Sequence, residues 1–224
     1  MAKIIVVGGD KGGTGKTTVS RILLDYLLSK GETVRAFDTE DRPVLARFFP
    51  DCTKMVDLAH TDGLMTVFDG LGAADVTVID VKANLLTPAL ESLDDIGLMD
   101  AVRAGRHQIL LLHVIGSSVA SFAEISSMTS WLVGLDHVVV LNHINSSDFF
   151  DWSPSQRAAL KLASAVIEIP QLDATSNEMA DVEGTSFAKF IADERISMVL
   201  RGLVRTWLGK CYAQLAKVIV DCEK

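Results

Sequence analysis

Residues 9–18 read Gly-Asp-Lys-Gly-Gly-Thr-Gly-Lys-Thr-Thr, and this stretch decides the fold. It follows the apolar, β-branched run Lys3–Val7, and it opens the segment Thr17–Lys30, whose apolar residues recur at helical spacing. Glycines between a strand and a helix let the backbone turn its N–H groups toward phosphate oxygens, and the positive end of the helix dipole favours the same anion. These features predict a phosphate-binding loop, or P-loop, at Lys11–Thr18.

Each residue type in the predicted loop has a chemical task. Lys16 can reach the β- and γ-phosphates of a nucleotide, and the Thr17 hydroxyl can ligate Mg²⁺. The strict motif has a glycine five residues before Gly15, where this sequence has Asp10. A glycine-rich turn without a ligand is the alternative, and the position of the loop between a strand and a helix argues against it. The residues expected to bind the nucleotide are Gly12, Gly13, Thr14, Gly15, Lys16, Thr17 and Thr18.

Further apolar runs alternate with helical patterns along the chain. Most of these runs are apolar on both faces, which is typical of parallel strands covered by helices on both sides. We therefore expect one α/β domain over residues 1–224, with a mostly parallel twisted sheet, closed by a C-terminal helical segment at about 194–222. The expected strands are Lys3–Val7, Thr33–Asp38, Val76–Asp80, Gln108–Ile115, His137–Asn142 and Ala165–Ile169, with an edge strand at Lys54–Leu58. The expected helices include Thr17–Lys30, Ser118–Val133 and Ser155–Ser164.

Two carboxylates stand where predicted strands end. Asp38 closes Thr33–Asp38, and Asp80 closes Val76–Asp80. Ligands of open parallel sheets bind at the carboxyl ends of the strands, and carboxylates suit a Mg²⁺ shell. We expect Thr17, Asp38 and Asp80 to form the magnesium site, although either aspartate alone could be a turn residue.

Composition narrows the class of protein. The chain has 224 residues, of which 49% are hydrophobic, and its net charge is −8. The acidic balance gives no general attraction to nucleic acid or anionic lipid. Three widely spaced cysteines do not form a disulfide or metal pattern, and no run has the length of a signal peptide core or a membrane span. We expect a cytoplasmic protein.

The stretch Lys11–Thr18, Lys-Gly-Gly-Thr-Gly-Lys-Thr-Thr, resembles the deviant Walker A box of the ParA/MinD family of P-loop ATPases. The resemblance implies MgATP as the ligand and an ATP-dependent homodimer. It also implies that Lys11 reaches across the dimer interface to the partner's nucleotide. Hydrolysis is expected to be slow and stimulated by a partner protein. The alternative for Lys11 is a solvated loop lysine.

The carboxylate segments depart from the family pattern. The family has Asp-x-Asp after the second strand, and the later aspartate positions the attacking water. Glu40 stands at that place and Asp41 follows it, so both are candidates for orienting water. Asp80 resembles the Walker B aspartate, but Val81–Asn84 replaces the small-residue and proline segment of the family.

Two later segments indicate which base is bound. Residues 142–145 read Asn-His-Ile-Asn, without the lysine and aspartate of a guanine-reading box, which favours adenine. Asn142 matches the adenine-contacting asparagine of the family. Pro170 and Gln171, after the last predicted strand, resemble the family segment that lines the adenine pocket, although a proline there could be an ordinary strand stop.

The resemblance implies an ATPase that positions, partitions or transfers a cargo, such as plasmid DNA or a division or conjugation complex. Two alternatives remain: a nucleotide-binding regulatory switch with little turnover, and a related P-loop enzyme acting on a small molecule. The basic C-terminal segment favours a buried closing helix, with non-specific DNA binding left open, and Asp221 and Glu223 argue against a membrane anchor. Its basic residues are Arg195, Arg201, Arg205, Lys210 and Lys217.

Overall fold

The computed structural model describes residues 2–117, 119–128, 131–132, 135–144 and 154–219. Its centre is a seven-stranded sheet in the order β3-β2-β4-β1-β5-β6-β7, and every neighbouring pair is parallel. The P-loop strand β1 therefore lies in the middle, between β4 and β5. The strands are β1 (Ala2–Gly8), β2 (Val34–Asp38), β3 (Thr53–Met55), β4 (Val76–Asp80), β5 (His107–Ile115), β6 (Asp136–Asn142) and β7 (Ala165–Ile169).

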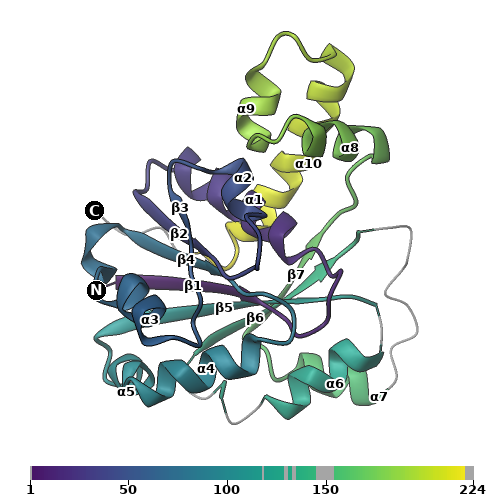
Figure 1. Ribbon diagram of the computed structural model, residues 1–224. Coiled ribbons are helices and arrows are strands. Elements are labelled where there is room, and N and C mark those ends of the chain that lie inside the picture. The colour runs from purple at the N-terminus through teal and green to yellow at the C-terminus, as the bar shows by residue number, and fades with distance from the viewer. Residues whose placement is uncertain (1, 118, 129–130, 133–134, 145–153, 220–224) are drawn as a thin grey trace.

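Helices cover both faces of this sheet. In Figure 1, α1, α2 and α10 lie above the sheet and α4 to α7 lie below it, while α8 and α9 extend at the top. The helices are α1 (Lys16–Ser29), α2 (Leu45–Phe48), α3 (Thr61–Phe68), α4 (Leu86–Asp95), α5 (Leu98–Arg103), α6 (Val119–Ser127), α7 (Pro154–Leu160), α8 (Ala174–Val182), α9 (Phe187–Ala192) and α10 (Met198–Leu215), with a 3-10 turn η1 (Leu71–Ala73).

The alternation of side chains along β1 divides the core into two layers. Ile5 and Val7 pack into the cluster that contains the apolar side of α1 and α10. Ile4 and Val6 pack into the cluster that contains α4 and α5. All four are almost completely buried, because a parallel strand with helices on both sides has no solvent face. The expected α/β fold with helices on both faces is confirmed.

The predicted elements are found with shifts at their ends. The edge strand expected at Lys54–Leu58 is β3, which pairs with β2 and ends at Met55. The helix expected over Ser118–Val133 corresponds to α6, which ends at Ser127, and part of the predicted range lies outside the described residues. Residues 220–222 of the predicted C-terminal segment also lie outside them.

The C-terminal segment is one helix, α10, which begins at Met198 rather than near Glu194. Its apolar side, which includes Val204, Trp207 and Cys211, is buried in the cluster around α1, and Arg205 and Lys210 are exposed. This arrangement agrees with the interpretation as a closing helix. Within the described part of the chain, no helix combines the length and the apolar character that crossing a membrane requires.

Candidate nucleotide-binding site

The loop between β1 and α1 has the backbone of a phosphate-binding turn. Gly13 and Gly15 have φ of +72° and +79°, the left-handed region that favours glycine. Gly15 is also the N-cap of α1, and a Cβ there would lie 2.3 Å from Asn142 Nδ2. Both conformation and space therefore require glycine at position 15. The loop leads straight into the N-terminus of a 14-residue helix, which suits an anion.

Lys16 is held inside this loop. Its side chain is buried, and Nζ donates to the carbonyl oxygen of Lys11 at 3.0 Å. Burial lowers the pKa of Lys16, while the nearby carboxylates of Asp80 and Glu40 oppose that change. A lysine whose ammonium is largely desolvated and bonded to a loop carbonyl is positioned to exchange that carbonyl for a phosphate oxygen.

Asp80 lies at the end of β4, directly beside Asp38 of β2 in the sheet register. Its side chain is buried, and none of the described residues donates a hydrogen bond to Oδ2. Burial raises the pKa of Asp80 to about 7, although the Thr17 hydroxyl opposes this, and the neighbouring Asp38 adds to the rise. A buried carboxylate oxygen without a partner, next to the Thr17 hydroxyl, fits a Mg²⁺ ion.

A magnesium ion in this place would need oxygens beyond the protein. Among the described residues, no group of three His, Cys, Asp or Glu side chains is arranged to hold a metal. Mg²⁺ in phosphate-binding sites typically takes one or two protein ligands and completes its shell with phosphate oxygens and water. The donor set of Thr17 and Asp80 fits that kind of site.

Asp38 has a different environment from Asp80. Its Oδ1 accepts the N–H of Glu40 at 3.1 Å, and its Oδ2 accepts N–H groups at the start of α2, including those of Val44 at 2.9 Å and Leu45 at 2.7 Å. Both carboxylate oxygens are thus used to shape the segment between β2 and α2. In this structure Asp38 positions Glu40 and α2, so direct contact with a metal would compete with these bonds.

The two candidates for orienting water differ in their surroundings. Glu40 is half-buried and close enough to Lys16 for its charge to affect the lysine's pKa. Asp41 is exposed and forms an ion pair with Lys82. Lys82 belongs to the segment that follows Asp80, and its N–H donates to the Thr39 hydroxyl at 2.8 Å. The β2 and β4 ends are therefore tied together outside the phosphate loop.

The residues predicted to contact the base gather around one pocket. Thr18, Asn142, Pro170 and Gln171 line a cavity of about 170 Å³ at the end of β6 and β7. Asn142 also holds the P-loop, because its Nδ2 donates to the carbonyl oxygens of Thr14 at 2.9 Å and Gly15 at 3.3 Å.

Sequence reasoning did not predict six further residues that line this pocket: His143, Ile144, Leu172, Ala174, Asn177 and Trp207. Trp207 lines the cavity, and its Nε1 donates to the Pro170 carbonyl oxygen at 2.7 Å. The sequence signal was present in a tryptophan on the apolar side of the closing helix. What was absent was any indication that α10 packs against the end of β7.

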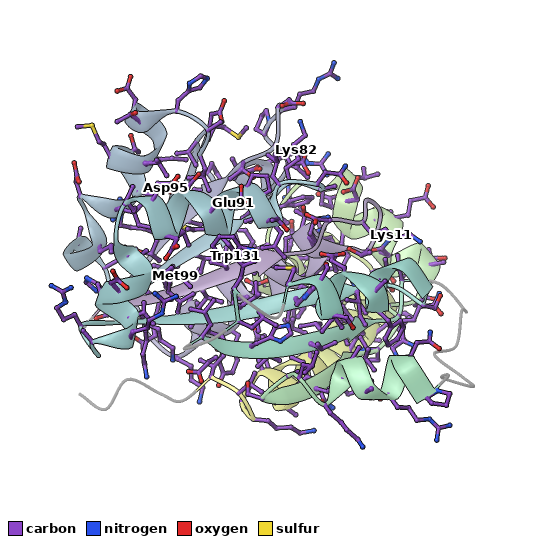
Figure 2. All side chains as sticks on the ribbon, turned by 90° about the horizontal axis from the view of Figure 1, so that it is seen from below. Lys11, Lys82, Glu91, Asp95, Met99 and Trp131 are labelled. Atoms are coloured by element: carbon purple, nitrogen blue, oxygen red, sulfur yellow. The ribbon has the colours of Figure 1, made fainter. Side chains whose placement is uncertain are left out.

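Lys11 lies on the outer side of the loop. Its side chain is exposed, while its carbonyl oxygen faces inward and accepts from Lys16. Figure 2 shows Lys11 at the margin of the molecule, far from Glu91 and Asp95 on α4. Lys11 and Lys16 therefore present their charges to different surroundings, one to solvent and one to the interior of the loop.

Comparison with known proteins supports the same reading of the fold. No family model matches this chain. The protein MobD of Acidithiobacillus ferrooxidans is 25% identical over 186 residues, which cover 81% of this chain and 80% of MobD. The septum site-determining protein MinD of Pyrococcus horikoshii OT3, complexed with Mg-ADP, has a TM-score of 0.56 and 18% identity, with 97% of each chain covered. A putative plasmid partition protein of Borrelia burgdorferi B31, bound to AMPPNP, has a TM-score of 0.57 and 13% identity, covering 98% of this chain and 100% of that protein.

The sheet order, the loop and these likenesses define the class: the chain has an α/β P-loop NTPase fold. Within that class, it has the fold of MinD and of ParA-like plasmid partition proteins, so the resemblance in the loop sequence is confirmed at the level of the fold.

Proposed function

We propose that this protein is a ParA/MinD-like ATPase that binds MgATP and works as an ATP-dependent dimer. Two observations carry the proposal together. Lys16 is buried and bonded to the loop, and the buried Oδ2 of Asp80, at the end of the strand beside β1, has no hydrogen-bond partner among the described residues. Gly12–Thr18 would hold the phosphates, with Lys16 on the β- and γ-phosphates. Thr17 and Asp80 would hold Mg²⁺, with Asp38 behind them. The nucleotides bound to the MinD and plasmid partition structures support this ligand.

The pocket at the ends of β6 and β7 is the proposed adenine site. Pro170 and Gln171 line it, and Trp207 also lines it with its indole N–H bonded to the Pro170 carbonyl oxygen. The Asn142 amide would link base recognition to the loop, since it already bonds the Thr14 and Gly15 carbonyls. ATP would then bind more tightly than GTP. A binding experiment in which the two nucleotides compete measures this preference.

Hydrolysis would require a group that orients water near the γ-phosphate. Glu40 is the better placed candidate, because Asp41 is paired with Lys82 at the surface, whereas the charge of Glu40 acts on Lys16. The exposed Lys11 would reach the nucleotide of a second copy and neutralise charge there. Binding would make the dimer, hydrolysis stimulated by a partner protein would release it, and the cycle would position, partition or transfer a cargo.

A nucleotide-binding switch with little turnover is the second candidate. The bonds from four backbone N–H groups to Asp38, including that of Ala46, favour it, because they fix the Glu40 segment in its present place. Steady-state phosphate release, measured with and without DNA or a partner protein, separates the two. Turnover that stays negligible in every condition supports the switch.

Lysine substitutions test the proposed function. Lys16→Ala should abolish MgATP binding in calorimetry, because the phosphates lose their buried cation. Lys11→Ala should keep binding but lose the dimer that a slowly hydrolysed ATP analogue induces, measured by light scattering after size exclusion. Lys54→Ala removes an exposed lysine from the edge strand and is the matched control.

The outcomes separate the parts of the proposal. No heat of MgATP binding to the unaltered protein would overturn nucleotide binding itself. An ATP-induced dimer in the Lys11→Ala variant would overturn the role of Lys11 and leave the binding site standing.

A further inference from the structure

Asp10 occupies the loop position where the strict P-loop motif has glycine, and it makes three contacts outside the loop. Its N–H donates to Glu124 Oε1 at 2.6 Å. Its carbonyl oxygen accepts from the Asn84 N–H at 3.0 Å. Its side-chain Oδ1 accepts from the Leu86 N–H at 3.1 Å. The residue therefore connects three chain segments that are distant in sequence.

The contact with Leu86 caps helix α4. This helix begins at Leu86, has no side-chain cap at its own N-cap Leu85, and has no acidic residue in its first turn. The first N–H groups of a helix need acceptors, and a carboxylate there also suits the helix dipole. Asp10 supplies that carboxylate from the phosphate loop. A glycine at position 10 could not do so.

Glu124 on α6 accepts the Asp10 N–H and is in turn bonded to one of a pair of buried histidines. Glu124 Oε1 also contacts His113 Nε2 at 2.9 Å, and His113 Nδ1 lies 3.3 Å from His137 Nε2. Both rings are buried, on β5 and β6. Because Oε1 accepts the Asp10 N–H, His113 Nε2 must carry the proton of its contact with Glu124.

The electrostatic surroundings keep Glu124 charged. Burial by itself raises the pKa of Glu124, but the His113 ring, the Asp10 N–H and the charge of Lys16 outweigh burial and hold it below its ordinary value. Burial, together with His113, lowers the pKa of His137 to about 4, so His137 is neutral at physiological pH. A carboxylate fixed by a buried ring is a rigid acceptor for a loop amide.

The segment between Asp80 and α4 makes this connection relevant to the nucleotide. Val81–Leu85 runs from the proposed magnesium ligand to the helix that Asp10 caps, and Asn84 within it has φ of +62°. The Asn84 N–H also bonds Asp10. The phosphate loop and the residues after Asp80 therefore share Asp10 as a common attachment point.

We propose that Asp10, fixed by Glu124 and His113, is a positioning residue that couples the phosphate loop to the start of helix α4. On this basis, rearrangement of the loop around a nucleotide moves or stabilises α4 through the Asp10 carboxylate. The aspartate that replaces the glycine of the strict motif therefore supplies a side chain that connects the nucleotide site to the start of α4. The coupling during ATP binding rests on the proposed function, whereas the link itself does not.

Amide hydrogen exchange of the nucleotide-free protein tests the link. Asp10→Gly should raise the exchange rate of the Leu86 amide and leave the amide of residue 10 protected. Glu124→Ala should raise both, by about tenfold to a hundredfold, as expected for loss of a hydrogen bond to a charged group. Glu124→Gln keeps an acceptor oxygen and should restore most of the protection. Glu91→Gln, an exposed change on α4 far from Lys11 in Figure 2, is the control.

The amide of Ile5 in the buried central strand serves as an internal reference for global unfolding. Unchanged exchange rates of both the Asp10 and the Leu86 amides in Glu124→Ala would overturn the role of Glu124 in fixing Asp10. Faster exchange of the residue 10 amide, with an unchanged exchange rate of the Leu86 amide, would overturn the coupling of Glu124 to α4 through Asp10. If Glu124→Ala does not fold, Asp10→Gly still tests the cap, because an unchanged exchange rate of the Leu86 amide in that variant would overturn the link.

A second measurement connects the link to the nucleotide. With a slowly hydrolysed ATP analogue and Mg²⁺, the unaltered protein should gain protection at the α4 N-terminus. Asp10→Gly should still bind the analogue but show no such gain, and a full gain in that variant would overturn the coupling. If the unaltered protein binds no nucleotide, the proposed function fails, while exchange in the nucleotide-free protein still judges the link.

Discussion

The charge state of Asp80 depends on whether the site holds a cation. Its carboxylate is buried beside Asp38, and burial raises its pKa to about 7. The folded state therefore binds a proton over the pH range in which the unfolded chain has already lost it. By linkage, this residue makes stability fall as pH rises from about 4 to about 7, after which its contribution stays level. A cation bound at Oδ2 would offset the loss of stability that the buried, ionised carboxylate causes.

We predict that Asp80→Asn stabilises the protein without nucleotide and abolishes its response to Mg²⁺. One pKa unit corresponds to about 1.4 kcal/mol, so the gain at pH 8 should be on the order of 2–4 kcal/mol. The measurement is urea denaturation at pH 5 and pH 8, with Asp95→Asn on the exposed side of α4 as control. A variant less stable than the unaltered protein at pH 8 would contradict the assignment of Oδ2 as an unpaired oxygen.

At the scale of elements, α1 holds the α8–α9 region through two charged residues on its buried side. The Arg21 guanidinium lies between the rings of Phe48 and Phe187, at 3.5 Å and 4.1 Å from their centroids. Asp25 Oδ2 accepts the N–H of Phe187 at 2.8 Å, which caps α9 from outside. Burial raises the pKa of Asp25 to about 6. The P-loop helix thus supports the region that precedes α10.

Two substitutions of Asp25 should separate its roles as acceptor and as charge. Asp25→Asn keeps an oxygen for the first turn of α9 and removes a charge whose burial is unfavourable above pH 6. Asp25→Ala leaves two N–H groups without an acceptor, so it should be less stable than Asp25→Asn by about 1–2 kcal/mol at pH 8. Urea denaturation measures the difference, and equal stability of the two variants would show that the cap carries no free energy.

Local signals explain which elements could be predicted from the sequence. The apolar runs that became β1, β5 and β6, and the glycine pattern at Gly13 and Gly15, depend on neighbours in sequence, so composition and spacing revealed them. The contact of Asn142 with the loop, and of Glu124 with His113 and Asp10, depends on which strands lie side by side. That information is absent from any single segment. His113 and His137 lie in two of the predicted strands, and neither segment alone indicates that the two rings meet.

At the scale of the whole molecule, nucleotide binding should raise thermal stability. A ligand at 100 times its dissociation constant stabilises the native state by about 2.7 kcal/mol, which for a chain of this size shifts Tm by roughly 5–10 °C. We expect this shift with MgATP in the unaltered protein and its absence in Lys16→Ala. Differential scanning fluorimetry measures it. An equal shift with GTP would contradict the preference for adenine.

Because all strands run in one direction, the sheet has one edge where the strands begin and another where they end, and substitutions have different consequences at the two edges. Every group discussed for the nucleotide lies at the rim where strands end, whereas the turns that feed the strands, such as Gly31 before β2 and Gly105 before β5, have open space around them. Gly105 itself has φ of +70°, which disfavours any side chain, but the exposed Ala104 in the same turn has φ of −82°. A fluorescent label on a cysteine introduced at Ala104 would therefore lie a full strand length away from the proposed phosphate site. A label at this position would allow the protein to be followed in cells without contact with the proposed nucleotide site.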